Sequence, residues 1–305
     1  MQDNSIKAEI IGFDSGWGCA NFGCEDGPGA LQADQILYLL RKHKVEAKWR
    51  GPLGLRFIGD HDEVRSKEDS LPQLLESVRR LAEHVSHSIE SGHIPVVIGG
   101  DHSSAIGTWS GAVSATDSYG RFGLVWLDAH LDAHTYETSS VGKWGGWWHG
   151  QPVTALLGHG LPSLRNIGGL MPKLAPQNLS IIGPHSFEEP EKEFVDRFGI
   201  RVFFYEEVEK RGFQACFDEA MERALDGTQA FGLSIDLDAF HPDDAPGVGT
   251  AEDRGLRADE VLPVIKSIAR HASFSGLELA EFNPHNDSMN KTLQLIENII
   301  ESAFS

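Results

Sequence analysis

The stretch "WLDAHLDAHTYE" (126–137) places two Asp-Ala-His triplets in immediate succession after an apolar run. The triplets hold two carboxylates and two imidazoles, on Asp128, His130, Asp132 and His134. Carboxylate and imidazole groups together are ligands of divalent transition metals, so this stretch is a candidate metal site. The alternative is a polar loop whose charged side chains are neighbours without a common ligand.

Three other segments carry similar side chains at the end of an apolar run. "GGDHSS" contains Asp101 and His102, "SIDLDAFHPDDAPG" contains Asp236 and Asp238, and "LAEFNP" contains Glu281. In an open α/β sheet, ligands bind outside the carboxyl ends of the strands. If each run is a strand, four strand ends would deliver these groups to one crevice.

The four aspartates in these segments would repel one another if they were packed together, and several would take up protons. Divalent cations remove that repulsion, and two cations can share carboxylates as bridges. Mixed oxygen and nitrogen ligands favour Mn, Zn, Fe or Ni over Mg or Ca alone. Asp236 and Asp238 alternate, which would place both on one face of a strand. One such pair often marks only a turn or a helix cap, but three at successive strand ends, with Glu281 on a fourth, favour a two-metal centre.

The elements that must position these groups are short apolar strands alternating with longer helices. Strands are predicted at 8–13, 94–100, 122–128, 179–183, 200–205, 230–238 and 274–282, and helices at 71–92, 206–227, 257–272 and 290–304. Several strands are apolar throughout, as strands covered on both faces are. The pattern predicts an α/β fold with one doubly wound, mainly parallel sheet and helices on both faces. No linker or repeat interrupts it, so we expect a single domain over 1–305.

Two segments depart from this alternation. Residues 14–31 are rich in glycine and precede a helix predicted to start near Pro28, and residues 135–153 form a loop rich in glycine and tryptophan. Long loops within compact domains are often functional, although either segment could be an ordinary connection.

Composition excludes some classes of partner. The chain has 26 basic and 45 acidic residues, a formal charge of −19, which argues against nucleic acid and anionic membranes. The surplus of carboxylates suits a cation or a cationic substrate, or simply solubility. Cys19, Cys24 and Cys216 form no disulfide framework, and neither a signal peptide nor an apolar run of roughly 18 residues is visible. We therefore expect a reduced, cytoplasmic protein.

The four ionisable segments, in this order, resemble the signature blocks of the arginase–agmatinase–formiminoglutamase family, the ureohydrolases. "GCEDGPGAL" and "HGQPV" also resemble arginase-type segments, and the resemblance runs from about residue 8 to 304. It implies an arginase-like three-layer α/β/α fold, and a homo-oligomer, either a trimer or a hexamer.

The resemblance also implies two Mn(II) ions per subunit. One ion would be held by His102, Asp128, Asp132 and Asp236, and the other by His130, Asp128, Asp236 and Asp238. Asp128 and Asp236 would be the bridges, and a hydroxide shared by the ions would attack the central carbon of a guanidino or amidino group. That carbon is a poor electrophile, and metal coordination lowers the pKa of water enough to supply hydroxide at neutral pH.

Two further residues match catalytic positions of the family. Glu281 would pair with the cationic guanidinium, and His149 would shuttle protons near the site. The alternatives are a purely structural role for Glu281 and packing of His149 against aromatic rings. Asp101 is expected to support the site through hydrogen bonds and not to bind metal.

Departures from the family pattern fall where the substrate's tail would bind. His134 stands where arginase has an Asn that contacts the substrate. His241 stands where the family usually has Asp, but that position binds no metal in the family pattern, so the metal site should be unaffected. Ser139 and Ser140 remain candidate carboxylate binders, and Glu188 or Glu189 could meet a substrate amino group. In the loop, Lys143 could bind a carboxylate, whereas Trp144, Trp147 and Trp148 could enclose an apolar or cationic tail, or pack at a subunit contact.

The predicted function is hydrolysis of a C–N bond in a linear amidine, with arginine as the first substrate and ornithine and urea as products. Agmatine, a guanidino acid and formiminoglutamate are alternative substrates. A binuclear phosphoesterase is disfavoured because its usual Gly-Asn-His or Gly-Asn-Asp segment is absent from the sequence. A non-catalytic metal-binding member of the family is the third possibility.

Overall fold

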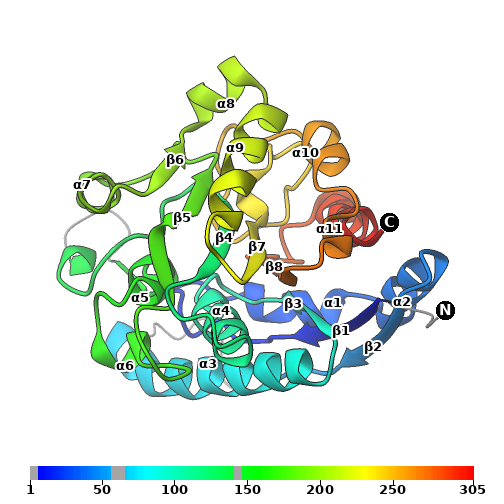
Figure 1. Cartoon of the computed structure of the whole chain (residues 1–305), viewed down its shortest axis with the longest axis horizontal. Helices are drawn as coiled ribbons and strands as arrows, with labels where there is room; N and C mark the ends of the chain where they lie inside the picture. Colours follow the sequence, from blue (N-terminus) through cyan, green and yellow to red (C-terminus); the bar gives the residue numbers. More distant parts are fainter. Residues whose placement is uncertain (1–5, 56–65, 141–145) are drawn as a thin grey trace.

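The computed structural model describes residues 6–55, 66–140 and 146–305. Its strands form one eight-stranded sheet in the order β2-β1-β3-β8-β7-β4-β5-β6 (Figure 1), and each pair of neighbouring strands is parallel. The predicted doubly wound parallel sheet is therefore confirmed. The strands are β1 (Lys7–Gly12), β2 (Glu46–Arg50), β3 (Ile94–Ile98), β4 (Phe122–Leu127), β5 (Leu174–Ile182), β6 (Arg201–Phe203), β7 (Ala230–Asp236) and β8 (Phe274–Ala280).

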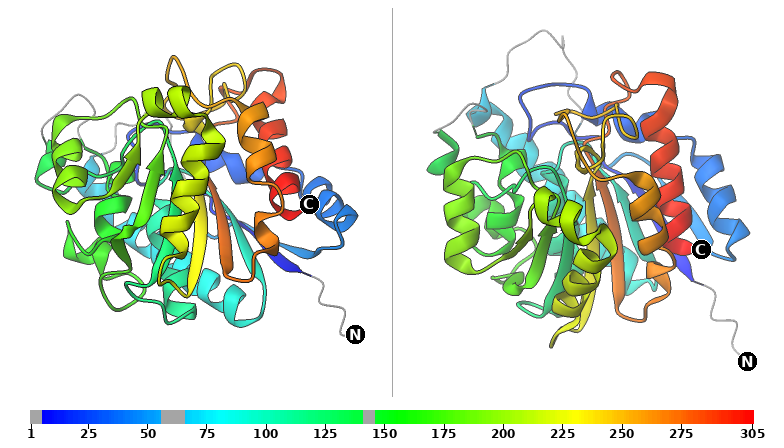
Figure 2. Two further views of the ribbon diagram at one scale, coloured as in Figure 1. Left: turned by 45° about the horizontal axis from the view of Figure 1, so that its top comes forward. Right: turned by 90° about the horizontal axis from the view of Figure 1, so that it is seen from above.

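Helices cover both faces of the sheet and make three layers (Figure 2). The longer helices are α2 (Ala33–Lys42), α3 (Lys67–Glu90), α4 (Ser104–Ala115), α7 (Glu189–Phe198), α9 (Phe213–Leu225) and α11 (Lys291–Phe304). The shorter ones are α1 (Gly27–Ala30), α5 (Pro152–Leu156), α6 (Pro162–Arg165), α8 (Tyr205–Arg211) and α10 (Ala258–Val264). One core cluster contains apolar side chains of α3 and α4, and the other contains those of α9, α10 and α11.

The two cores lie on opposite faces of the same strands. In β4, Val125 and Leu127 belong to one core, whereas Leu124 and Trp126 belong to the other, because successive side chains of a strand point to opposite faces. Every residue of β4 is buried. A strand covered on both sides is largely apolar, which is why these strands could be predicted from short apolar runs.

Some elements differ from the prediction. The edge strand β2 was not predicted, because its sequence EAKWR is polar and it pairs with β1 alone among the described strands. Helix α4 was also missed: it is buried around most of its circumference and has no polar face to give a helical period. The predicted helix 206–227 is divided into α8 and α9 at Gly212, whose φ is 83°. The predicted helix 257–272 ends early, at Val264.

The four strands that end in ionisable residues are adjacent in the sheet. The order β3-β8-β7-β4 is its central part, although β3 and β4 precede β7 and β8 in the chain by more than a hundred residues. Because all four strands are parallel, their carboxyl ends meet at the same edge. The fold thus brings the four ionisable segments to one place, as the sequence predicted.

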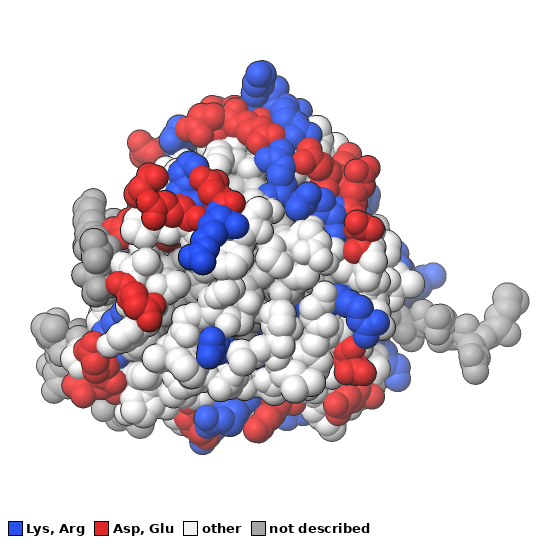
Figure 3. Space-filling view, turned by 60° about the vertical axis from the view of Figure 1, so that its left-hand side comes forward, with Lys and Arg blue, Asp and Glu red and all other residues white. Residues whose placement is uncertain are grey.

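The surface carries charges of both signs. On the face seen in Figure 3, Lys and Arg side chains lie among Asp and Glu side chains. Arg201 and Arg211 each form ion pairs with Glu207 and Glu219, which ties β6 to α8 and α9. Within the described ranges, no helix is both long enough and apolar enough to cross a bilayer.

Burial on both faces of the sheet makes its central strands sensitive to lost volume. Leu233 of β7 is fully buried, whereas Leu170 is 69% exposed. We expect Leu233→Ala to lower the free energy of unfolding by about 2–5 kcal/mol, because it leaves a cavity in the core. Leu170→Ala removes the same atoms from the surface and should change that free energy by no more than about 0.5 kcal/mol. Urea denaturation of both variants measures the difference, and equal losses would contradict this description of the core.

Candidate active site

His102 is the centre of a first group of acidic side chains. It follows β3 through Gly100, where a Cβ atom would lie 1.8 Å from the carbonyl oxygen of Ser15, so no larger residue fits without moving the backbone. The Nδ1 atom of His102 lies 3.3 Å from Oδ2 of Asp128, 3.1 Å from Oδ2 of Asp132 and 3.0 Å from Oδ2 of Asp236. These are the four residues predicted for the first ion.

His130 is the centre of a second group. Its Nδ1 lies 3.4 Å from Oδ1 of Asp128 and 3.2 Å from Oδ2 of Asp238. Asp128 therefore turns one carboxylate oxygen toward His102 and the other toward His130, the arrangement expected of a bridging ligand. Asp236 contacts His102 through Oδ2 and accepts a hydrogen bond from the Asp238 amide through Oδ1 (2.9 Å), so its role as a second bridge stays a prediction.

Three of the four aspartates lie just beyond the strands, and the fourth is the last residue of one. β4 ends at Leu127, and Asp132 adopts a left-handed conformation with a φ of 47°. Asp236 is the last residue of β7, and Asp238 lies in the 3-10 turn Leu237–Ala239. The expected shared strand face for Asp236 and Asp238 is therefore wrong, because the chain leaves the strand between them.

Burial and mutual repulsion act on all four carboxyl groups. Burial, together with Asp128, raises the pKa of Asp132 to about 7. Burial also raises the pKa of Asp236 and of Asp238, and neighbouring carboxylates add to both shifts. Burial would raise the pKa of Asp128 too, but the adjacent rings of His102 and His130 outweigh it and hold the pKa below its ordinary value. Positive charge placed among these groups would favour their ionised forms.

A divalent metal would supply that charge, and the donor set fits one. Two groups of side chains, His102 with Asp128 and Asp132, and Asp128 with His130 and Asp238, each bring one ligand atom per residue to within 4.8 Å of the others. Nδ1 of His102 is buried and forms no hydrogen bond of regular geometry among the described residues, although three carboxylates face it. A ring nitrogen in that setting is suited to bind a cation.

A second layer of polar residues fixes the His102 ring. Its Nε2 lies 3.3 Å from the Ser234 hydroxyl, which donates to Glu278 (2.7 Å). Trp126 stacks on the ring at 4.3 Å between centroids and donates from Nε1 to Asp128 Oδ2 (2.8 Å). Ser234, Glu278 and Trp126 were not predicted from the sequence. The available signal was a polar residue inside the apolar runs of β7 and β8, because a buried polar group requires a partner.

Glu281, at the end of β8, is held in a strained position. Its φ is 65°, a conformation that costs energy outside glycine and often marks functional sites. Its Oε1 accepts the His102 amide (2.8 Å) and lies 3.3 Å from Nδ1 of His149. Its Oε2 accepts a hydrogen bond from the Cys24 thiol (3.2 Å). The carboxylate is thus fixed from three directions beside the two aspartate groups.

His149 lies over the site and is anchored by the glycine-rich N-terminal segment. Its amide donates to the Gly18 carbonyl (3.0 Å), and the Gly18 amide donates to Asp101 Oδ2 (2.8 Å). Burial alone would lower the pKa of His149, but Glu281 outweighs it and raises the pKa to about 9. Asp101 also accepts a hydrogen bond from the amide of Ser103 (3.0 Å), so its contacts are with the loops that frame the site.

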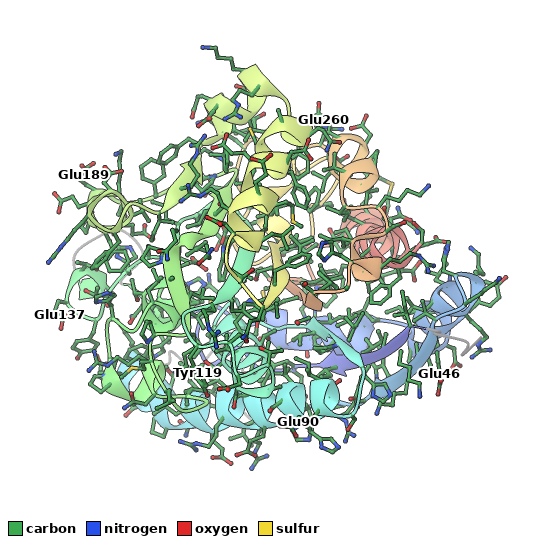
Figure 4. The ribbon with its side chains drawn as sticks, in the orientation of Figure 1. Glu46, Glu90, Tyr119, Glu137, Glu189 and Glu260 are labelled. Atoms are coloured by element: carbon green, nitrogen blue, oxygen red, sulfur yellow. The ribbon has the colours of Figure 1, made fainter. Side chains whose placement is uncertain are left out.

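One pocket opens onto both aspartate groups. Its lining includes His130, Asp132, Asp236, Asp238, His149 and Glu281 at one end. Trp147, Phe187, Glu188 and Glu191 line its outer part. Glu189 is exposed and lies on the outer side of α7 (Figure 4), so of the two glutamates considered for a substrate amine, Glu188 is the one that faces the pocket.

His134 lies beyond both aspartate groups. Its Nε2 is 3.3 Å from Oε2 of Glu188 and 3.3 Å from Oε2 of Glu191, and its Nδ1 is 3.2 Å from the Thr138 hydroxyl. Burial lowers the pKa of His134 and raises that of Glu191 to about 7. The second imidazole of the Asp-Ala-His repeat therefore faces the outer, acidic part of the pocket and not the metal-ligand groups.

The remaining predicted residues lie in different surroundings. Ser139 is buried, accepts a hydrogen bond from Lys67 Nζ (2.6 Å) and donates to the Tyr136 carbonyl (2.9 Å), so its predicted contact with substrate stays a prediction. Trp148 is buried against α3, where its Nε1 donates to the Lys67 carbonyl (2.9 Å). The side chain of Ser140, and Lys143 and Trp144 entirely, lie outside the described residues.

Known proteins resemble this chain over its whole length. The family model described as "Arginase family" matches residues 7–305. The arginase of Bacillus caldovelox is 34% identical over 297 residues, which cover 97% of each chain. The arginase of Brevibacillus brevis is 32% identical over 295 residues, 97% of this chain and 96% of that one.

Solved structures agree with these relatives. The crystal structure of arginase from Bacillus subtilis superimposes with a TM-score of 0.87 at 30% identity and covers 99% of both chains. Formimidoylglutamase from Bacillus subtilis, at 18% identity and a TM-score of 0.74, shares the fold. With its parallel sheet, its paired histidine–aspartate groups and this full-length similarity, the chain belongs to the Arginase family of binuclear metal hydrolases, which cleave C–N bonds in amidines.

Proposed function

We propose that this protein is an arginase, which hydrolyses arginine to ornithine and urea at a pair of Mn(II) ions. The proposal rests mainly on the orientation of the Asp128 carboxylate, because one of its oxygens faces His102 and the other faces His130. The full-length relatives named as arginases support the choice of arginine.

Six side chains would hold the metals: His102 and Asp132 would serve one ion, His130 and Asp238 the other, and Asp128 and Asp236 both. When bound, two divalent ions lower the pKa of a water molecule so that it can act as a nucleophile near neutral pH. The imidazole and carboxylate ligands suit Mn(II).

Glu281 is proposed to bind the substrate's guanidinium group. Its carboxylate is ionised, because hydrogen bonds to His149, His102 and Cys24 outweigh burial and lower its pKa. An ionised carboxylate pairs with a planar guanidinium through charge-assisted hydrogen bonds. Since the backbone and three neighbours fix Glu281, it would orient the central guanidino carbon toward the aspartate groups.

His149 is proposed to move protons during the reaction. Its Nδ1 faces Glu281, which leaves Nε2 as the atom that would deliver a proton to the departing amine. The loop that includes Trp147 and the N-terminal segment through Gly18 hold this ring at the pocket. A mobile proton donor is needed because an amine leaves readily only when it is protonated.

The outer part of the pocket is proposed to select the substrate's tail. Glu188, fixed by His134, would meet the α-amino group, and Ser139 and Ser140 would meet the carboxylate. Agmatine, which lacks the carboxylate, is the main alternative substrate, followed by guanidino acids and formiminoglutamate. We further propose that the protein works in the cytoplasm as a homo-oligomer, a trimer or a hexamer.

A substrate panel tests this assignment. The protein, loaded with Mn(II), is incubated with arginine, agmatine, guanidinobutyrate and formiminoglutamate, and urea or formamide is measured. We expect urea from arginine at a kcat/KM at least tenfold above that for each other substrate. Preference for another member of the panel would reassign the substrate, and no product from any of them would refute the activity.

Asp128→Asn tests the shared ligand. Because Asp128 faces both histidines, its loss should weaken metal binding at both positions. The loss of affinity should exceed the roughly 10–100-fold effect of removing a residue that only hydrogen-bonds to a ligand. Activity should fall in parallel. Asp243→Asn, at a side chain that is 75% exposed, is the matched control and should bind metal normally. Metal analysis after dialysis measures the effect, and retention of two ions by Asp128→Asn would contradict the bridge.

Cys24→Ala tests how Glu281 is positioned. The thiol is a weak donor, worth about 1 kcal/mol here, so its loss should raise the KM for arginine roughly fivefold. Cys24→Ser keeps a donor and should restore most of the affinity. Cys216→Ala also replaces a buried thiol, but on α9, and should leave KM unchanged. An unaltered KM in Cys24→Ala would show that the thiol does not orient Glu281.

A further inference from the structure

We propose that Glu252 is a positioning residue for the metal ligand His130: it accepts a hydrogen bond from Nε2 of the ring and so directs Nδ1 toward Asp128 and Asp238. This inference rests on the proposed function, because it assumes that His130 binds a metal. It assigns a role to a residue that lies outside the ionisable segments of the sequence.

The two nitrogens of His130 have different partners. Nδ1 faces Asp128 and Asp238 at 3.4 and 3.2 Å, whereas Nε2 lies 3.2 Å from Oε1 of Glu252. A carboxylate accepts but does not donate when ionised, so Nε2 must carry the proton in this contact. The proton is then excluded from Nδ1 in the neutral ring, which leaves its lone pair free for a cation.

Glu252 is held where it can act on the ring. Its side chain is only 19% exposed, and its Oε1 lies 3.2 Å from Nε2 of His130. A metal-bound imidazole whose other nitrogen donates to a carboxylate is a better electron donor and is fixed in orientation.

The loop that carries Glu252 is fastened at both ends to the strands of the site. Val248 forms an isolated antiparallel bridge with Phe282, next to Glu281, and Leu256 forms a parallel bridge with Phe240. The Leu256 amide also donates to the carbonyl of Ala239, the residue after Asp238 (2.7 Å). The position of Glu252 over His130 is thus determined by the ends of β7 and β8.

The two histidine ligands are supported differently. Nε2 of His102 reaches a carboxylate indirectly: it contacts the Ser234 hydroxyl, which donates to Glu278. All three side chains are buried. His130 contacts Glu252 directly at the rim of the site, where the two side chains are 21% and 19% exposed. The second metal position should therefore depend on one replaceable surface-loop residue, which makes the inference testable without altering the core.

Glu252 has a second set of neighbours that offers a competing explanation. Ligand atoms of His185, Glu252 and Asp253 lie within 4.8 Å of one another. If these three residues form a separate site, Glu252 would act with His185 and Asp253, and not through His130. Variants of Asp253 and His185 separate the two explanations.

Mn(II) titration of the metal-free full-length protein, followed by the electron paramagnetic resonance signal of free Mn(II), tests the proposal. Glu252→Ala should weaken one of the two Mn(II) sites about 10–100-fold and leave the other unchanged, and Glu252→Gln, whose amide oxygen still accepts from Nε2, should recover most of that affinity. Asp253→Ala removes the same charge from the next residue and should bind within about twofold of the parent. The melting temperature of the metal-free protein should be equal in all variants, whereas the rise on adding Mn(II) should be smaller in Glu252→Ala, because bound metal stabilises by mass action.

Two results would overturn the inference: parental Mn(II) affinity in Glu252→Ala, or equal weakening by Asp253→Ala or His185→Ala. Its failure differs from failure of the proposed function. If the parent protein binds two Mn(II) ions but releases no urea, the substrate assignment fails and the role of Glu252 is still decided by the titration. If the parent binds no second ion, the two-metal site fails, and the inference with it.

Discussion

The site depends on the electrostatic cost of burying Asp128, Asp132, Asp236 and Asp238 together. Each is at most 8% exposed, and burial with mutual repulsion raises the pKa of three of them. Native proteins rarely bury charges without compensation. Two imidazoles supply part of it, and a pair of divalent cations would supply the rest. The carboxylates repel one another in the folded chain, and this repulsion is what would favour the binding of metal ions.

The order of the sheet makes this concentration of charge possible. β3, β8, β7 and β4 are consecutive, so residues from four distant segments meet at one edge, while the strands behind them are largely apolar. Glycine at position 100 lets two backbone segments approach closely beside His102. The carboxyl ends of the central strands carry the groups proposed to hold the metals, whereas loops carry His149 and the residues proposed for the substrate, including His134 and Glu188.

Much of this could be predicted from the sequence. Strands buried on both faces leave short apolar runs, and the ionisable residues that follow them are conspicuous, so the parallel sheet and the meeting of Asp128 with Asp236 were accessible. Helix α4 and strand β2 were not, because one has no polar face and the other is a polar edge. Ser234 and Glu278 could have been noticed as polar residues inside apolar runs, but the sequence does not show which ligand they support, because that depends on how the strands are aligned. Glu252 lies in a loop outside the ionisable segments, and no local pattern places it beside His130.

The central claim is that one carboxylate, Asp128, is shared by two metal ions. Crystals of the Mn(II)-loaded protein, measured by anomalous scattering at the manganese edge, test it most directly. We expect two manganese peaks about 3.5–4 Å apart, one beside His102 and the other beside His130, with Asp128 bound to both. A single peak, or two peaks of which only one contacts Asp128, would contradict it.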